Sequence, residues 1–542
     1  MQRNLDALTT QNFDLVVIGG GINGAATARE AALRGLKVAL VEAGDFAGGT
    51  SSRSSKLIHG GLRYLEQFDF RLVHESRAER RLLLKLAPHL ARPLPFVLPI
   101  YRGDPYSPLK IRAGLTIYDL MGSLGRADRH RMLSARQVLS LIPALRSGGL
   151  MAAAIYHDSE TDDARLTLEN VLDAADHGAM VANYAEIRAF SLSTRAGEVA
   201  AGQIEDILTG RRYEIAARFW VNAAGPWVDV VRGLLPGFDG SRSVRLSKGT
   251  HVILPQVDRR HAIFAAILPG KRIFVMAPWY DHTLLGTTDT DFEGDPAGAR
   301  PEAVDVDYLQ AAANRVLRQP LRPEQVLGCF AGLRALAVEP GRSPSENTRE
   351  YRFHEEPEIR NFISICGGKL TTARALGEKL VHRIAGRLGR AASRGLSSRQ
   401  APLPGGRTGP LEAFVAYATE EAIEDFGIPR PIAERIVRTY GSRWRQVLAP
   451  IRERPSLGDA LPGTPSLLAA EVSFAIHEEM ALSVEDFMLR RSGLNWLGAC
   501  SPARDAAPEV ARIFASEFHW TPERRQAAVD AFAQAAAVPG KD

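Results

Sequence analysis

The chain has 542 residues, of which 45% are hydrophobic and 24% charged, so its composition is that of a globular protein with two or three domains rather than a disordered or fibrous one. Its formal net charge is only +5, and the part beyond residue 390 carries 17 Lys and Arg against 19 Asp and Glu. The mild basic excess of the first 390 residues suits an anionic substrate, an anionic cofactor or an acidic membrane surface, and it is too weak and dispersed to indicate nucleic-acid binding.

The cysteine content and the hydropathy exclude further classes. Cys329, Cys366 and Cys500 lie far apart and form no CxxC, so we expect no iron–sulfur or zinc site and no other metal. The N-terminus has no apolar segment of the signal-peptide type, and no run approaches the roughly 18 apolar residues that span a bilayer. We therefore expect a cytoplasmic protein, either free or held on the membrane surface.

The first part of the chain predicts a strand, a helix and a second strand in immediate succession. The apolar run at 14–19 predicts a buried strand, and residues 25–33 predict a helix that Gly35 ends. A second strand follows at 37–41. This order is typical of the first unit of an open α/β sheet.

Three glycines at the first strand–helix turn have the G-x-G-x-x-G spacing of a dinucleotide-binding site. They are Gly19, Gly21 and Gly24, and the acidic residue Glu42 follows the last of them by 18 positions, close to the usual distance of about 20. Glycine here allows a tight turn, a close backbone approach to a pyrophosphate and packing of the helix on the strand. The helix N-terminus attracts phosphate, and Glu42 can accept hydrogen bonds from a ribose. The fingerprint predicts a dinucleotide without deciding between FAD and NAD.

A hydroxyl-rich stretch, GGTSSRSSK at 48–56, follows the second strand and continues into LIHGGLRYLE at 57–66. Composition alone would make it a Ser-rich surface loop, but its position places it near the edge of the sheet where ligands bind. Together with GGGINGA at 19–25, the segment TSSxSSKLIHGGLRYLE resembles the FAD-dependent glycerol-3-phosphate dehydrogenases. These belong to the D-amino-acid-oxidase-like group of flavoproteins.

The resemblance implies a set of residues that contact FAD in the first two segments. They are Gly19, Gly21, Asn23, Gly24, Glu42, Thr50, Ser51, Ser52, Ser55, Lys56 and Leu57. It also implies that Arg63 and Tyr64 face the phosphate of the substrate. No histidine or cysteine lies in an obvious attachment motif, so we expect the FAD to be non-covalent.

Two later segments match the same family in the same order. FWVNAAGPWV at 219–228 resembles the strand by which the chain re-enters the FAD domain, with Gly225 close to the cofactor. KGTHVILP at 248–255 resembles a segment that lines the substrate cavity. His251 is therefore the leading candidate for a general base, because histidine can take a proton near neutral pH. His59 and a bound water are the alternatives.

The segments beyond residue 285 add two arginines. LGTTDTD at 285–291 matches a turn of the family, and in FAGLRAL at 330–336 the family has an arginine that holds the substrate, here Arg334. Ala335 stands where the family usually has proline. Arg349, in the segment NTREY, is a second match and implies another substrate contact.

A second glycine loop, ICGGKLTT at 365–372, predicts the start of a helix. By the resemblance, Gly368, Lys369, Leu370 and Thr371 contact the cofactor. The helix N-terminus and Lys369 would place positive charge beside the flavin ring, where it stabilises negative charge.

The expected fold class is α/β, or α+β over the whole chain. A Rossmann-like FAD-binding domain is interleaved with a β-sheet substrate domain, and a C-terminal helical domain follows. The expected boundaries are 12–390 for the oxidoreductase region, with FAD-binding segments at about 12–100, 150–245 and 340–385, then a linker at 391–410 and the helical domain at 411–535.

The resemblance implies oxidation of sn-glycerol 3-phosphate to dihydroxyacetone phosphate. Arg63 and Arg334 would bind the phosphate, His251 would take the C2 hydroxyl proton, and the C2 hydride would pass to N5 of FAD. Electrons would then go to a quinone, with oxygen as the other possible acceptor. The family also implies a peripheral enzyme on the cytoplasmic face of the membrane, and we expect a homodimer.

Two other functions and one structural alternative stay open. An amine or amino-acid oxidase of the same group would need a single cationic side chain to bind a carboxylate. A flavin-bearing RNA-modifying or binding protein would need a strongly basic patch, which the acidic tail disfavours. The amphipathic stretch 109–126 predicts a helix that either covers the core, the commoner case, or lies on an anionic bilayer.

Overall fold

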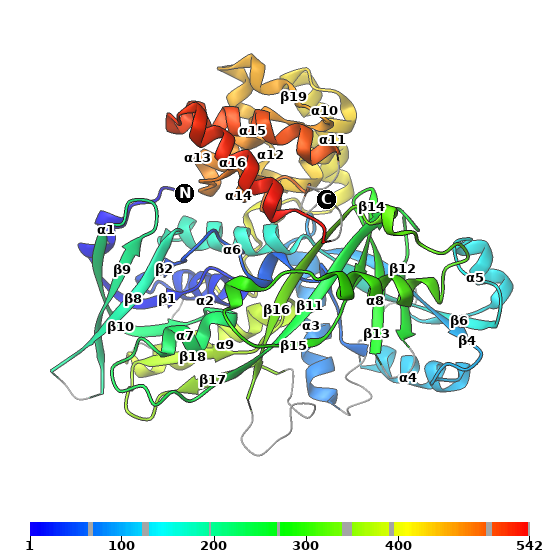
Figure 1. Cartoon of the computed structure of the whole chain (residues 1–542). Coiled ribbons are helices and arrows are strands. Elements are labelled where there is room, and N and C mark those ends of the chain that lie inside the picture. The colour runs from blue at the N-terminus through cyan, green and yellow to red at the C-terminus, as the bar shows by residue number, and fades with distance from the viewer. Residues whose placement is uncertain are drawn as a thin grey trace.

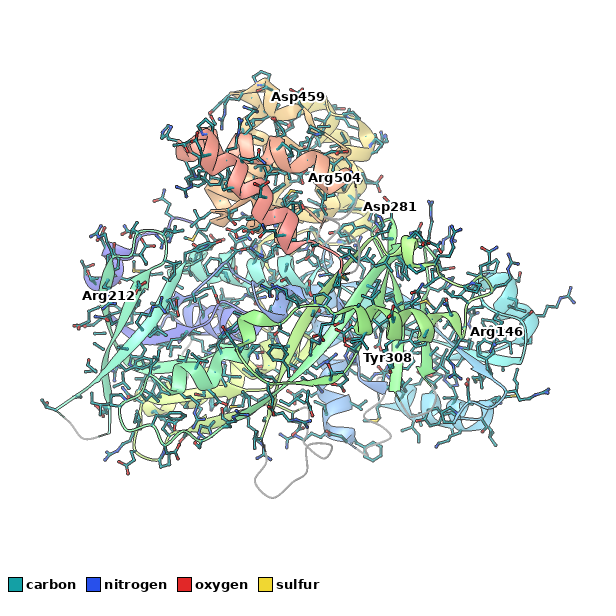
Figure 2. All side chains as sticks on the ribbon, viewed as in Figure 1. Arg146, Arg212, Asp281, Tyr308, Asp459 and Arg504 are labelled. Carbon is teal, nitrogen blue, oxygen red and sulfur yellow. The ribbon has the colours of Figure 1, made fainter. Side chains whose placement is uncertain are left out.

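The structure is a computed structural model, and it describes residues 1–62, 69–121, 129–194, 197–267, 272–338, 350–389, 395–494 and 501–539. Two large sheets lie side by side, and a helical domain sits on top of them (Figure 1). Arg212 and Arg146 lie at opposite ends of the molecule, which shows how far the two sheets reach to either side of the centre (Figure 2).

The first sheet has eight strands within the described residues, in the order β17-β18-β10-β1-β2-β7, with β9 also paired to β10 and β8 to β9. Its centre is parallel, from β18 through β10, β1 and β2 to β7. The strands are β1 (Asn12–Ile18), β2 (Val38–Val41), β7 (Met180–Ala182), β8 (Ala185–Leu192), β9 (Val199–Asp206), β10 (Arg212–Asn222), β17 (Arg352–Glu355) and β18 (Phe362–Cys366).

The apolar run of β1 is buried on both faces, as the sequence predicts for a central parallel strand. Leu15 and Val17 face the helices α2 (Ile22–Leu33), α6 (Asp163–Asp176) and α9 (Ala373–Arg387). Val16 and Ile18 face the other way, where side chains of β8 and β9 cover the sheet together with α1 (Leu5–Thr9). Another short helix, α7 (Val228–Arg232), follows the end of β10.

The second sheet has ten strands in the described part of the chain, in the order β15-β11-β14-β13-β12-β4-β6-β3, with β16 paired to β11 and β5 to β6. They are β3 (Leu57–Ile58), β4 (Arg92–Tyr101), β5 (Arg131–Ser134), β6 (Leu150–Glu160), β11 (Val244–Pro255), β12 (Ala262–Ile267), β13 (Arg272–Trp279), β14 (His282–Gly286), β15 (Thr290–Phe292) and β16 (Gly328–Ala337). Helices α5 (Ala135–Leu141) and α8 (Ala303–Asn314) pack on one face, and α3 (Phe70–Leu86) and α4 (Pro108–Leu120) on the other.

The strands of the second sheet correct two of the expected boundaries. The segments 12–100 and 150–245 were expected to belong to the FAD-binding domain, but β3, β4 and β6 lie in the second sheet. β4 and β6 pair with each other along most of their length. The sequence of a single strand carries no information about which sheet it joins, because that is decided by its pairing partners.

The C-terminal domain is helical, as expected, with one short hairpin. Its elements are α10 (Leu411–Phe426), α11 (Arg430–Tyr440), α12 (Trp444–Leu448), β19 (Ala460–Leu461), β20 (Thr464–Leu468), α13 (Ala469–Glu479), α14 (Val484–Arg490), α15 (Ser501–Phe518) and α16 (Pro522–Ala535). These helices share one apolar core, which Trp279 and Phe330 of the second sheet join.

The expected linker at 391–410 is packed in its described part, which begins at residue 395. Leu403, Gly405 and Gly406 are buried, and the Gly405 N–H donates to the buried carboxylate of Glu169. The glycines leave room for this approach, because a Cβ at Gly405 would lie 2.6 Å from that carboxylate. The Pro/Gly-rich composition therefore marks a strap fastened to the first domain and not a free spacer.

No helix in the described ranges is both long enough and apolar enough to cross a lipid bilayer.

Candidate active site

A cavity of about 930 Å³ lies between the two sheets. On one side it is lined by the carboxyl ends of β1, β2 and β10, which is where an open parallel sheet binds ligands. On the other side it is lined by residues of β11 and β16 from the second sheet. The site is thus shared between the two sheets that the chain enters alternately.

The turn between β1 and α2 is built for close backbone contact. Gly19 has φ +106°, and a Cβ there would lie 2.7 Å from the carbonyl oxygen of Ala223, after β10. A Cβ on Gly24 would overlap the Gly19 carbonyl oxygen. The N-terminus of α2 therefore points into the cavity, with its backbone N–H groups near the cavity wall. The Ser51 hydroxyl accepts a hydrogen bond from one of these groups, the N–H of Ile22, at 2.8 Å.

Glu42 stands directly after β2 and is partly buried. Its carboxylate accepts the N–H of Gly20 at 2.6 Å and that of Gly44 at 2.8 Å. Burial raises the pKa of this carboxyl, and the two backbone hydrogen bonds oppose the rise. Each carboxylate oxygen keeps a lone pair for another donor, so the residue can hold a ribose hydroxyl.

These features fit FAD. A helix N-terminus opens toward the cavity, glycines leave room for a pyrophosphate, and a partly buried carboxylate stands at the ribose position. The loop at 367–371 approaches the first turn of α2, where the Asn23 amide donates to the Gly367 carbonyl at 3.1 Å. The 930 Å³ cavity has the size expected for a cofactor site.

The hydroxyl-rich loop divides between the cavity and the core. Thr50, Ser51, Ser55 and Leu57 line the cavity, whereas Ser52 is fully buried away from it.

Lys56 also does not line the cavity, contrary to expectation. Its ammonium is 2.6 Å from the carboxylate of Asp163, at the start of α6, and donates to the Ser52 carbonyl. A buried ammonium requires a carboxylate partner. Asp163 is not among the residues that line the cavity, so the ion pair holds the Lys56 ammonium away from it.

His251 lies on β11 with its ring buried. Its Nε2 is 2.9 Å from the Ser55 hydroxyl, and its ring stacks on Phe330 with the centroids 5.0 Å apart. Burial first, and then the positive charges of Arg334 and Lys56, lower the pKa of His251 to about 3. The imidazole is therefore neutral at physiological pH, and its surroundings make it a weak base. Its Nδ1 is buried without a hydrogen-bond partner in the described part of the chain.

Arg334 lies on β16, directly opposite Ser247 of β11. Its guanidinium donates to the Thr287 hydroxyl at 3.1 Å and lies 3.4 Å from a carboxylate oxygen of Asp289. It passes close to the backbone of Gly249, where a Cβ would be 2.6 Å from Nη2. The cation is held at the cavity wall near His251.

Most predicted site residues come together in this cavity. Those that line it are Gly19, Gly21, Asn23, Glu42, Thr50, Ser51, Ser55, Leu57, His59, Gly225, His251, Arg334, Gly368, Lys369, Leu370 and Thr371. Gly24 packs behind the lining against Gly19. Arg63, Tyr64 and Arg349 lie outside the described residues.

Four arginines that line the cavity were not among the predicted site residues: Arg53, Arg188, Arg300 and Arg490. Arg53 lies within the hydroxyl-rich loop, and burial, with smaller contributions from the charges of Arg490 and Arg300, lowers its pKa to about 10. Arg490 comes from α14 of the C-terminal domain. The basic position inside TSSRSSK could have suggested Arg53, whereas nothing in the local sequence connects Arg490 to a site more than 400 residues away.

Comparison with known proteins agrees with this geometry. The family model for FAD dependent oxidoreductases matches residues 14–383, and the model for the C-terminal domain of alpha-glycerophosphate oxidase matches residues 396–525. A glycerol-3-phosphate dehydrogenase of Synechocystis sp. is 36% identical over 509 residues, which cover 91% of this chain and 90% of that protein. This chain belongs to the FAD-dependent glycerol-3-phosphate dehydrogenase family.

Two further relatives cover nearly the whole chain. The aerobic glycerol-3-phosphate dehydrogenase of Bacillus subtilis is 33% identical over 96% of this chain and 93% of its own length. The structure of the glycerol-3-phosphate dehydrogenase of Bacillus halodurans complexed with FAD superposes with a TM-score of 0.80, at 31% identity over 99% of this chain and 98% of that one. Family membership confirms the expected fold class and FAD as the cofactor.

The burial of His251 predicts a specific pH dependence of stability. The unfolded chain protonates this histidine below its ordinary pKa of 6.5, whereas the folded protein keeps it neutral down to about pH 3. Stability is therefore lost as pH falls from 6.5 toward 3, by about 2 kcal/mol from this residue at pH 5. We expect His251→Gln to show a smaller drop in unfolding free energy between pH 7 and pH 5 than the wild type, measured by urea unfolding. Equal drops in the two proteins would contradict the buried neutral histidine.

Proposed function

We propose that this chain oxidises sn-glycerol 3-phosphate to dihydroxyacetone phosphate with FAD as the hydride acceptor, and passes the electrons to a quinone. The observation that carries the proposal is that a neutral histidine and two cations line the same cavity as the dinucleotide-binding turn. His251 and Arg334 lie on the neighbouring strands β11 and β16, and Lys369 lines the cavity from the loop at 367–371. The names of full-length relatives support the choice of substrate.

The segments that carry these three residues are tied together. Ser55 contacts His251, and two residues beyond Leu57 the backbone N–H of His59 donates to the Thr371 hydroxyl at 3.3 Å. This bond holds the 369–371 loop beside the loop that positions His251. A small substrate bound here can meet the base and the cations at once.

Each residue has a role that its environment allows. Arg334 presents a guanidinium fork, which binds a phosphate through paired hydrogen bonds. His251 is neutral and accepts the proton of the C2 hydroxyl, either directly or through the Ser55 hydroxyl. Lys369 places its ammonium at the cavity wall and provides positive charge where negative charge develops. Bound FAD supplies the hydride acceptor.

Arg63, Tyr64 and Arg349 stay predictions as further substrate contacts. His59, the alternative base, lines the same cavity. Burial and the two neighbouring cations keep His251 neutral at neutral pH, so its ring can accept a hydrogen bond from the C2 hydroxyl. The same surroundings make it a weak base until the substrate phosphate offsets their positive charge.

An anaerobic titration tests the substrate. The purified yellow protein should lose its flavin absorbance within seconds when glycerol 3-phosphate is added without oxygen. Glycine and other amines should leave the absorbance unchanged. Bleaching by an amine, and not by glycerol 3-phosphate, would replace the proposal by an amine or amino-acid oxidase activity.

Arg334 can be tested separately from the cofactor. We expect Arg334→Ala to raise KM for glycerol 3-phosphate about 10- to 100-fold, because a charge-assisted contact to the phosphate is lost, while bound FAD is retained. The matched control is Arg245→Ala, which removes an arginine that pairs with Asp291 on the same sheet and does not line the cavity. Steady-state kinetics with a soluble electron acceptor measures both. A normal KM in Arg334→Ala would remove this residue from the substrate site.

The acceptor and the location are part of the proposal. We infer that the outer surface of α4 lies on the membrane, where a quinone is available. Leu109 is 77% exposed and Leu120 79%, Ile117 is also exposed, and basic Lys110 and Arg112 lie beside them. Leu115 and Tyr118 anchor the opposite side of the helix in the core. Exposed leucines next to basic residues are what an interfacial helix presents to an anionic bilayer.

Vesicle binding tests this surface. We expect the wild type to sediment with vesicles that contain anionic phospholipid, and the double variant Leu109→Glu, Leu120→Glu to lose at least about 10-fold in binding, because apolar burial is replaced by charge repulsion. Activity with a soluble acceptor should be retained. Leu208→Glu, an exposed leucine in the turn between β9 and β10, is the control and should bind normally. Unchanged sedimentation of the double variant would exclude α4 as the contact.

The homodimer stays a prediction.

A further inference from the structure

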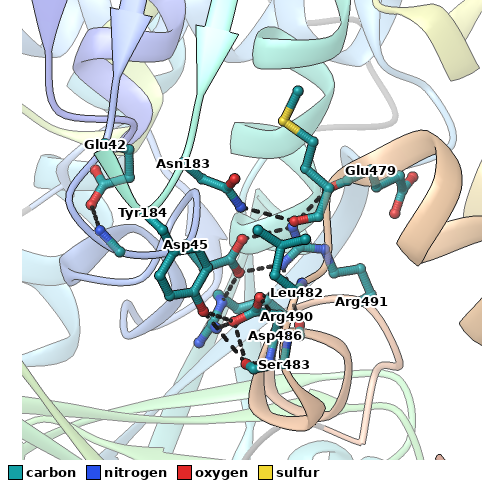
Figure 3. Close-up of polar contacts among 12 residues, drawn as sticks. Glu42, Asp45, Asn183, Tyr184, Glu479, Leu482, Ser483, Asp486, Arg490 and Arg491 are labelled. Atoms are coloured by element: carbon teal, nitrogen blue, oxygen red, sulfur yellow. Dashed lines mark hydrogen bonds and ion pairs between the residues drawn. The ribbon is translucent and has the colours of Figure 1, made fainter. Parts of the chain in front are cut away.

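A buried ionic cluster joins the C-terminal domain to the FAD-binding domain. Asp45 of the first domain receives two arginines from the end of α14, Arg490 through Nε and Arg491 through Nη1 and Nη2 (Figure 3). Asp486, one turn earlier on α14, pairs with Arg490 at 2.7 Å and accepts the Tyr184 hydroxyl, also at 2.7 Å.

The two arginines differ in where they point. Arg491 donates to Asp45 and to the backbone carbonyls of Asp486 and Glu479, and it does not line the FAD cavity. Arg490 does line the cavity. Its Nε and Nη2 are held by the two carboxylates, while its Nη1 has no hydrogen-bond partner among the residues that the structure describes. The side chain of Arg490 is 8% exposed, so this donor is confined to the cavity.

The position of Arg490 along the cavity can be fixed from its neighbours. Asp45 lies three residues after Glu42, the carboxylate at the ribose position, and the charge of Arg490 acts on the pKa of Glu42. The same charge acts on Arg53 in the loop that follows. Arg490 thus lies between the end of β2 and the hydroxyl-rich loop. This places Arg490 beside Glu42, the carboxylate at the expected ribose position.

We propose that Arg490 donates through Nη1 to the AMP half of FAD, so that the C-terminal domain supplies a cofactor-binding residue. The proposal rests only on FAD occupying this cavity and not on the identity of the substrate. An adenosine phosphate offers ribose and phosphate oxygens as acceptors, and a guanidinium is the side chain that suits them.

The two carboxylates make Arg490 a fixed donor. Because Asp45 and Asp486 hold two of its nitrogens, the third is aimed without loss of side-chain entropy when the ligand binds. Asp45 belongs to the FAD-binding domain and Asp486 to the C-terminal domain. The donor is therefore correctly placed only while the two domains are docked, which couples domain docking to cofactor retention.

The test compares Arg490→Met with Arg491→Met, because both remove an arginine from Asp45 and only the first removes a group from the cavity. The apoprotein of each variant is titrated with FAD, followed by flavin fluorescence, and with ADP, which carries the AMP half without the flavin, followed by calorimetry. The melting temperature of each apoprotein is recorded by circular dichroism. Glycerol 3-phosphate is absent throughout, so failure of the proposed reaction cannot affect the result.

We expect Arg490→Met to weaken both FAD and ADP binding about 10- to 100-fold. Arg491→Met should lower the melting temperature and leave the affinity for ADP within about twofold of the wild type. A twofold change in affinity corresponds to less free energy than one hydrogen bond contributes. ADP and FAD affinities in Arg490→Met within twofold of the wild type would overturn the proposal. So would equal losses of ADP affinity in both variants together with equal drops in melting temperature, because the cluster would then act through docking alone.

Arg490→Lys covers the case in which the methionine variant does not fold. It keeps the charge beside Asp45 and Asp486. One ammonium, however, cannot contact both carboxylates and also donate into the cavity, as the planar guanidinium of arginine can. We expect a folded protein with ADP affinity reduced at least about fivefold. Wild-type ADP affinity in this variant would again overturn the proposal.

Discussion

The site depends on the absence of side chains where β1 meets α2. At Gly19 and Gly24 the backbone of the turn touches the chain after β10 and the first turn of the helix itself, and a Cβ at either glycine would collide with a carbonyl oxygen. These contacts join segments about 200 residues apart and set the direction of α2. They leave the helix N-terminus facing the cavity, where an anion is favoured by both the free N–H groups and the helix dipole.

The two sheets contribute different kinds of group to one cavity. The first sheet and its loops offer backbone N–H groups, hydroxyls and the carboxylate of Glu42, which suit a large cofactor with many polar groups. The second sheet offers ionisable side chains on rigid strands, with His251 and Arg334 on neighbouring β11 and β16. Burial and two nearby cations prevent the histidine from being protonated before the substrate binds. The positive surroundings that bind an anionic substrate therefore also keep the base unprotonated.

Sequence reasoning succeeded where the signal is local and failed where a partner is distant. The strand, glycine turn, helix and Glu42 lie within 30 residues, and each has one structural meaning, so the whole unit could be predicted. The motif around Lys56 resembles a cofactor loop, yet its ammonium is directed by Asp163, and no spacing in the sequence reveals that pair. Likewise the place of the β4 and β6 segments in the chain predicts that they belong to the FAD-binding domain, but their sheet is decided by pairing with each other and with β12.

The contact between the C-terminal and FAD-binding domains shows why such charges matter beyond stability. Glu479 is buried between Arg165 and Arg443, as Asp45 is between Arg490 and Arg491. Buried ion pairs of this kind recover little more than the desolvation they require, so replacing them by apolar residues need not weaken the contact. A purely apolar contact, however, could slide, whereas a carboxylate moved away from its arginines would be left unpaired at a cost of several kcal/mol. Two such clusters, joined by the hydrogen bond from Arg491 to the Glu479 carbonyl, permit one docking position. It is this restriction, more than any gain in stability, that can hold a guanidinium of one domain at a fixed place in the cavity of another.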